Sequence, residues 1–140
     1  MLKSLENRSA VSSLIFARII YAVNWLNLGA VFVLMEPDLG VNIGALGNLT
    51  SAFYVGIGLM QVPGGLMAAK WGAKRVVVAG IFLSSISALL TAASSDILEI
   101  EILRFFVGTG MAFVFSPAVM LVAKLFGGKP GVGIGLFNSA

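Results

Sequence analysis

Residues 76–95, VVVAGIFLSSISALLTAASS, contain no charged side chain over 20 consecutive positions. A membrane-spanning helix needs about 20 predominantly apolar residues, so this run predicts a transmembrane helix. The composition of the whole chain agrees, because 59% of its 140 residues are hydrophobic, 11% are charged and the mean hydropathy is +1.02. A soluble domain carries about 25% charged residues. The sequence therefore predicts an all-α integral membrane protein.

Charged residues divide the rest of the chain into similar runs, which place the other helices. We predict membrane spans at 14–35, 49–69, 76–95 and 97–123, and the start of a fifth span at 131–140. The segment 40–48 is rich in Gly and Asn, so it is expected to be a loop or an interface. The chain is thus expected to form a single partial transmembrane domain, a helical bundle.

Basic and acidic residues alternate at the successive ends of these spans. The N-terminal tail, the 70–75 loop and the 124–129 segment carry bases, whereas the segments 36–38 and 96–101 begin with acids. Because bases are retained on the cytoplasmic side, the N-terminus is expected in the cytoplasm and the chain in the plasma membrane. The net charge of +3 then reflects topology. It does not indicate nucleic-acid binding, which needs a basic stripe with aromatic platforms.

Missing residue types exclude most enzymatic chemistry. The chain has no Cys and no His, which excludes the usual zinc sites and histidine-based general acid–base catalysis. It has no phosphate-binding GxxxxGK[ST] loop. Glu99 and Glu101 are two residues apart, so on a helix they point to different faces and make a poor catalytic pair. We therefore expect neither an enzyme nor a protein with a resident metal or cofactor.

Polar side chains inside the predicted spans are candidates for a solute pathway, because polar groups in hydrocarbon are costly. The candidates are Asn24, Asn27, Tyr54, Gln61 and Arg104. The two asparagines are three residues apart and share a helix face, which fits interhelical hydrogen bonding as well as it fits a pathway. Tyr54 and Gln61 lie on one stripe of the second span, which is either a packing seam or part of the pathway.

Small residues predict where the helices touch. Gly58 and Gly65 continue the stripe of the second span, and small residues on a helix face allow a neighbouring backbone to approach closely. Gly108 and Ala112 form a similar small-residue face on the fourth span. We therefore predict helix packing at Gly58, Gly108 and Ala112.

Two arginines lie within the predicted spans. Arg104 is the one base toward the outer side, and it can pair with Glu101 three residues earlier or face the bundle interior as a functional cation. Arg18 lies in the first span, about two turns from Asn24. We expect its guanidinium to extend to the cytoplasmic headgroups, as long basic side chains near helix ends do.

The segment 65–75, GLMAAKWGAKR, resembles the signature loop of the major facilitator superfamily, usually written G-x-x-a-D-r-x-G-r-r/k. The matching residues are Gly65, Gly72, Lys74 and Arg75, and Lys70 stands where the family has Arg. Ala69 stands where the family has Asp. By this resemblance, the segment would be a gating loop that latches the two halves of a transporter in the outward-open state.

Two further segments carry the same resemblance, which covers roughly 35–140. Residues 104–108, RFFVG, are similar to the R-x-x-x-G pattern of the family's fourth helix, and residues 133–139, GIGLFNS, fit the start of its fifth. The resemblance implies that Arg104 is the fourth-helix arginine linked to proton coupling in antiporter members. The coupling ion would be H⁺ or Na⁺.

Family members have twelve helices in two six-helix halves around a midplane site. The resemblance therefore implies a partial N-terminal half of a secondary active transporter, which moves a small solute by alternating access. A fragment of this kind is expected to need the missing C-terminal helices or a complementary chain, and not to transport alone. Its other partners would be the lipid bilayer and the small-molecule solute.

Two other functions stay open on the sequence. The chain could be a non-transporting assembly or regulatory subunit that docks its small-residue faces on a partner. It could also be a small four-helix transporter that works as a homodimer. Such dimers generally depend on a carboxylate within the membrane, and the first three predicted spans contain none.

Overall fold

The computed structural model describes residues 12–13, 15–16, 18–19, 21–23, 40 and 42–139. The described residues from 12 to 23 are helical, and we call them the N-terminal helical stretch. Four helices follow: α2 (Ile43–Trp71), α3 (Ala73–Ala93), α4 (Ile97–Leu125) and α5 (Pro130–Ser139). No strand occurs in the part of the chain that the structure describes.

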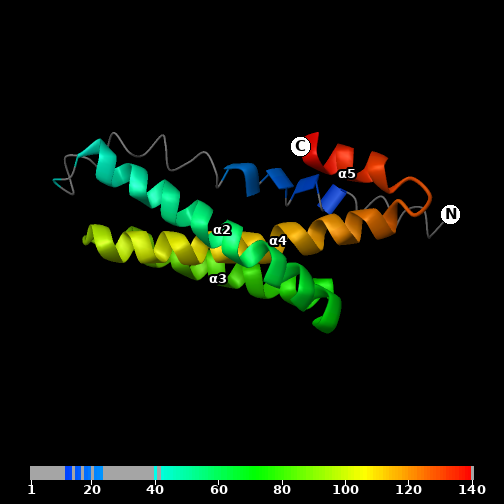
Figure 1. The fold of residues 1–140 in the computed structure, drawn as a ribbon, viewed down its shortest axis with the longest axis horizontal. Helices are drawn as coiled ribbons and strands as arrows, with labels where there is room; N and C mark the ends of the chain where they lie inside the picture. Colours follow the sequence, from blue (N-terminus) through cyan, green and yellow to red (C-terminus); the bar gives the residue numbers. More distant parts are fainter. Residues whose placement is uncertain are drawn as a thin grey trace.

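Helix α4 forms the centre of the bundle and packs against α2, α3 and α5. Figure 1 shows α2 crossing α4 on one side, α3 lying along α4, and α5 folding back beside the C-terminal half of α4. The N-terminal helical stretch lies next to α5 and α4 (Figure 1). The C-terminal half of α4 is therefore enclosed by elements from both ends of the chain.

Among the described residues, three helices are long and apolar enough to cross a membrane: α2 over Gly47–Trp71, α3 and α4. Their outer surfaces carry large apolar side chains that are each more than 60% exposed, among them Leu59, Val62 and Leu66 of α2 and Phe82 and Leu89 of α3. Contiguous apolar surface of this kind suits contact with lipid rather than water. The predicted all-α membrane bundle is confirmed.

Helix α2 begins at Ile43 rather than at residue 49, so most of the predicted 40–48 loop is helical. The reason is a capping residue, because the Asn42 Oδ1 accepts a hydrogen bond from the Ala45 N–H at 2.9 Å. Asp96 caps α4 in the same way, since its Oδ1 accepts a hydrogen bond from the Leu98 N–H at 2.9 Å. Helix α5 begins at Pro130, whose missing N–H costs nothing at a first helical position.

The connection between α2 and α3 depends on Gly72. Only this residue separates Trp71 from Ala73, and its φ is +92° and its ψ 134°. The Gly72 N–H also donates a hydrogen bond to the Ala68 carbonyl oxygen at 3.0 Å, which closes the last turn of α2. Glycine adopts this backbone conformation without the steric cost that a Cβ would add.

Replacing Gly72 by Ala is expected to lower the free energy of unfolding by about 1–3 kcal/mol, because the turn then places a Cβ in a strained conformation. The measurement is the thermal unfolding midpoint of the purified chain in detergent. Gly128→Ala is the matched control, because Gly128 lies in the α4–α5 turn, its φ is not positive and an added Cβ would meet no described atom within 4 Å. Equal midpoints for the two variants would contradict this role of Gly72.

Close contacts between backbones hold α2 against α4. A Cβ at Gly108 would collide with the carbonyl oxygen of Phe53, and a Cβ at Gly56 would collide with the carbonyl oxygen of Phe105. Ala112, one turn after Gly108, is 0% exposed. The two helices therefore approach each other at positions where only small residues fit.

The packing prediction for Gly58 differs from what the structure shows. A Cβ at Gly58 would meet no described atom within 4 Å, and the residue is exposed. The glycines of α2 whose added Cβ would collide with α4 are Gly56 and Gly64 instead. At the level of Gly58, the face that α2 turns toward α4 is thus the one that carries Gly56.

Helices α3 and α4 also touch through glycines. A Cβ at Gly80 would lie 2.6 Å from the Gly110 carbonyl oxygen, and a Cβ at Gly110 would lie 2.6 Å from the Gly80 carbonyl oxygen and 2.7 Å from the Ser84 nitrogen. Buried hydroxyls continue along this face of α3, where the Thr91 Oγ1 donates a hydrogen bond to the Ser87 carbonyl oxygen at 2.8 Å. The Ser84 Oγ likewise donates a hydrogen bond to the Ile81 carbonyl oxygen at 3.0 Å, so both hydroxyls find their partners within α3.

Candidate functional site

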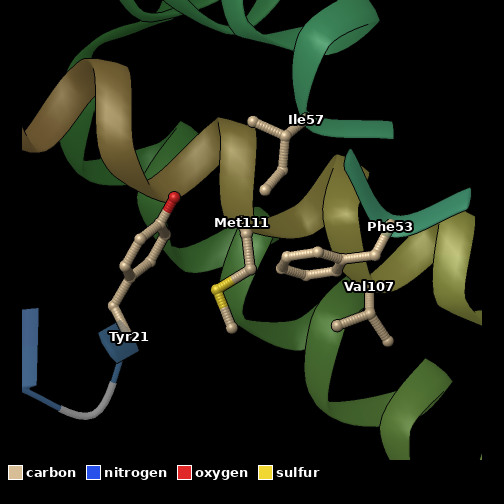
Figure 2. Close-up of a cluster of buried hydrophobic side chains, with 5 residues drawn as sticks. All are labelled: Tyr21, Phe53, Ile57, Val107 and Met111. Atoms are coloured by element: carbon tan, nitrogen blue, oxygen red, sulfur yellow. The ribbon is translucent and has the colours of Figure 1, made fainter. Parts of the chain in front are cut away.

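Five buried side chains from three parts of the chain meet beside the middle of α4, and we call them the central cluster. They are Tyr21, Phe53, Ile57, Val107 and Met111 (Figure 2). Tyr21 comes from the N-terminal helical stretch, two members come from α2 and two from α4. This apolar contact ties the start of the chain to the α2–α4 pair.

Three aromatic rings surround a guanidinium next to the central cluster, and we call the four residues the arginine–aromatic cage. The Arg18 Cζ lies 5.1 Å from the ring centroid of Tyr21, 5.9 Å from that of Phe115 and 6.0 Å from that of Phe137. The Phe115 centroid lies 5.7 Å from that of Tyr21 and 6.2 Å from that of Phe137. A cation within about 6 Å of an aromatic centroid is attracted to the ring face.

The position of Arg18 contradicts the expectation that it reaches the headgroups. Its guanidinium lies beside Phe115 of α4 and Phe137 of α5, and Phe137 is only 4% exposed. The Arg18 Nε is buried and has no hydrogen-bond partner. The expectation was wrong because the aromatic faces on α4 and α5 attract the guanidinium into the bundle, which the sequence of the first span cannot reveal.

Arg104 is a second arginine with a buried Nε that lacks a hydrogen-bond partner. Both Glu101 and Arg104 are described, and no ion pair between them is formed. Arg104, Met111 and Phe115 lie seven and eleven residues apart, so they share one face of α4. The central cluster thus lies along α4 between Arg104 and the arginine–aromatic cage.

Tyr54 and Gln61, the other predicted pathway residues that the structure describes, do not join this face. Tyr54 is 48% exposed and its ring packs edge-on against Phe53, with 5.7 Å between centroids. Gln61 is partly buried, and its backbone carbonyl oxygen accepts a hydrogen bond from the Ser116 Oγ at 3.0 Å. Asn24 and Asn27 lie outside the described residues.

The predicted gating loop lies at the turn between α2 and α3. Lys70, Lys74 and Arg75 are all exposed there. Gly65 lies within α2, where an added Cβ would come 3.9 Å from the Ser116 Cβ. The loop therefore presents three positive charges at one end of the bundle, whereas the described acids lie at the other end of α3.

The described acids are Asp96, Glu99 and Glu101, at the start of α4. The Glu99 Oε2 accepts a hydrogen bond from the Ser94 Oγ at 2.6 Å, across the α3–α4 connection. In the described part of the chain, no group of three or more His, Cys, Asp or Glu side chains is placed to hold a metal ion. Among the described charged side chains, buried polar atoms without a hydrogen-bond partner belong to Arg18 and Arg104.

Sequence reasoning missed the aromatic partners of Arg18. Tyr21 follows Arg18 by three residues, so a shared helix face was readable from the spacing. Phe115 and Phe137 lie on two other helices, and single-sequence periodicity gives no signal for contacts between helices so far apart in the chain.

Comparisons with known proteins agree with this architecture. The family model for the Major Facilitator Superfamily matches residues 14–140. A probable galactarate/D-glucarate transporter of Pseudomonas putida is 33% identical over 113 residues, which are 76% of this chain and 25% of that protein. A probable sulfoacetate transporter of Cupriavidus necator is 29% identical over 96 residues, 69% of this chain and 22% of that protein.

Human monocarboxylate transporter 11 is 29% identical over 123 residues, which are 83% of this chain and 26% of that protein. The chain spans about a quarter of the length of the curated relatives it matches. No solved structure matches it significantly.

Proposed function

Because the chain belongs to the major facilitator superfamily, we propose that it is part of a secondary active transporter that moves a small organic anion across the membrane by alternating access. The observation that carries the proposal is the pair of arginines, Arg18 and Arg104, whose buried Nε atoms have no hydrogen-bond partner. Ionisable residues within a membrane bundle are costly and mark substrate or ion pathways.

The names of the relatives support an anionic substrate. Galactarate, glucarate, sulfoacetate and monocarboxylates all carry negative charge at neutral pH. Arginine is suited to such groups, since its planar guanidinium binds carboxylates through two parallel hydrogen bonds. We propose that the anion, and with it a coupling ion, interacts with the face of α4 that carries Arg104.

The gating loop is proposed to face the cytoplasm of a plasma-membrane protein, with the N-terminus on the same side. Its exposed bases, Lys70, Lys74 and Arg75, are free to meet acidic groups of a second transporter half. Ala69 removes the carboxylate that the family pattern has in this loop. The latch would therefore depend on the bases alone.

We also propose that transport requires helices in addition to those of this chain. Alternating access rocks one repeat against another around a shared site, and the relatives are about four times as long as the segment that matches. The additional helices would come from a longer protein or from a complementary chain.

The test is a reconstitution of the 140-residue chain in vesicles with an imposed H⁺ or Na⁺ gradient and radiolabelled solutes. We expect saturable binding of organic anions such as benzoate, no binding of neutral sugars and no accumulation of any solute. Binding of neutral sugars without binding of any anion would contradict the proposed substrate class. Accumulation by the chain alone would contradict the need for further helices.

A further inference from the structure

The guanidinium of Arg18 lies deeper in the bundle than that of a residue near a helix end. Met111 is the midpoint of α4, and Phe115, which contacts the guanidinium, is four residues beyond it. Four residues correspond to about 6 Å along a helix axis. Arg104 is seven residues from the midpoint in the other direction. An arginine at the depth of Arg18 is costly unless a counter-charge accompanies it.

No acid of the neighbouring helices supplies that counter-charge. The sequence has no Asp or Glu from 39 to 95 or after Glu101. Glu101 is fourteen residues from Phe115, or about 21 Å along α4. No ion pair or hydrogen bond joins Arg18 to another residue that the structure describes. Aromatic faces attract the guanidinium but carry no net charge, so within the described part of the chain its charge of one is not compensated.

The arginine–aromatic cage leaves donors available. Cation–π contacts with Tyr21, Phe115 and Phe137 use the charge of the guanidinium but none of its five N–H donors. The Nε is enclosed, while the Arg18 side chain as a whole stays partly exposed. The remaining donors can therefore meet a group that enters the bundle, and a carboxylate matches their geometry.

We propose that the arginine–aromatic cage is a carboxylate-binding site, in which Arg18 binds the carboxylate and the neighbouring rings contact the apolar body of a small organic acid. The central cluster extends the apolar wall next to Tyr21. This inference rests on the proposed transport of an organic anion, and it names the residue that binds the anion. A cage that only braced the helices would bind no ligand, which separates the two roles experimentally.

The experiment measures benzoate binding to the purified 140-residue chain in detergent, with benzamide as the uncharged probe of the same shape. We expect saturable benzoate binding, none of benzamide, and affinity about tenfold or more weaker in Arg18→Gln, because a charge-assisted hydrogen bond is lost. Arg18→Lys should bind with intermediate affinity. Lys124→Gln, which removes an exposed charge at the end of α4, should bind like the wild type.

A second measurement needs no variant. An arginine-specific dicarbonyl reagent modifies accessible guanidiniums, and peptide mass mapping reports the rate at each arginine. Benzoate should slow the modification of Arg18 and leave that of Arg75 unchanged, whereas benzamide should protect neither. This result also supports the site if Arg18→Gln fails to fold.

Two outcomes overturn the proposal in distinguishable ways. If the wild type binds benzoate, but Arg18→Gln binds it equally well or Arg18 is not protected, the cage is not the site and the proposed anion transport still stands. If the wild type binds no carboxylate, the cage is not a carboxylate site, whereas the proposed anion transport is judged separately, by the anion gradient in vesicles that contain this chain together with the further helices.

Discussion

Gly108→Ala is expected to destabilise the bundle by about 1–3 kcal/mol, as overpacking of a close contact does. The added methyl group would meet the carbonyl oxygen of Phe53 and lie 3.2 Å from the Ile57 nitrogen, and these are backbone atoms of α2 that no rotamer change can move. The helices would have to separate, which would loosen the central cluster on both sides. The measurement is the thermal unfolding midpoint of the chain in detergent.

Gly58→Ala is the matched control for this prediction, because it makes the same substitution within α2 at a position where the added Cβ meets no described atom within 4 Å. Alanine is favoured over glycine in a helix interior by about 1 kcal/mol, so the control should be neutral or slightly stabilised. Gly110→Ala should repeat the Gly108 result at the α3–α4 contact. A Gly108→Ala midpoint equal to that of Gly58→Ala would contradict the backbone contact.

The positions of the helices could be predicted from the sequence because charges are expensive inside a membrane. The run 76–95 ends at Asp96, and this residue is the cap that begins α4. The start of α2 was less readable, since Asn42 and the following glycines also suit a loop. Only the capping hydrogen bond to the Ala45 N–H decides for a helix that starts at Ile43.

The rotation of each helix could not be predicted in the same way. A helix surrounded by lipid and by other apolar helices has little contrast between its faces, so periodicity does not reveal which face packs inward. The glycines of α2 illustrate this, because Gly56 and Gly58 are equally small and two residues apart. Only the first lies against α4, on the side of α2 where Phe53 and Ile57 pack against α4 in the central cluster.

The same limit explains the outcome for the candidate site. Arg104 could be selected from the sequence because it opposes the charge pattern, but the spacing of three residues also allowed a pair with Glu101, which the two described side chains do not form. Arg18 was expected to leave the bundle, because nothing in the first span indicates Phe115 or Phe137. The sequence thus shows which polar residues are costly to place inside the bundle. Which partner offsets that cost for each of them depends on how the helices pack.

Arg104→Ala is expected to reduce anion transport by about tenfold to a hundredfold, which corresponds to the loss of one charge-assisted hydrogen bond in the translocation pathway. Arg104→Lys keeps the charge but loses the two-point geometry of the guanidinium, so it should retain part of the activity. The measurement is the steady-state gradient of a radiolabelled organic anion in vesicles that contain this chain together with the helices required for transport.

Glu101→Gln is the control, because Glu101 lies one turn from Arg104 and forms no ion pair with it. If Arg104 acted through that acid, the Gln variant would lose transport as well; if Arg104 acts on the anion or on the coupling ion, the Gln variant should transport like the wild type. Unchanged solute gradients in Arg104→Ala would eliminate a functional role for this arginine. The burial of its Nε without a hydrogen bond would then destabilise the bundle without serving transport. The anion would have to be bound by Arg18 alone.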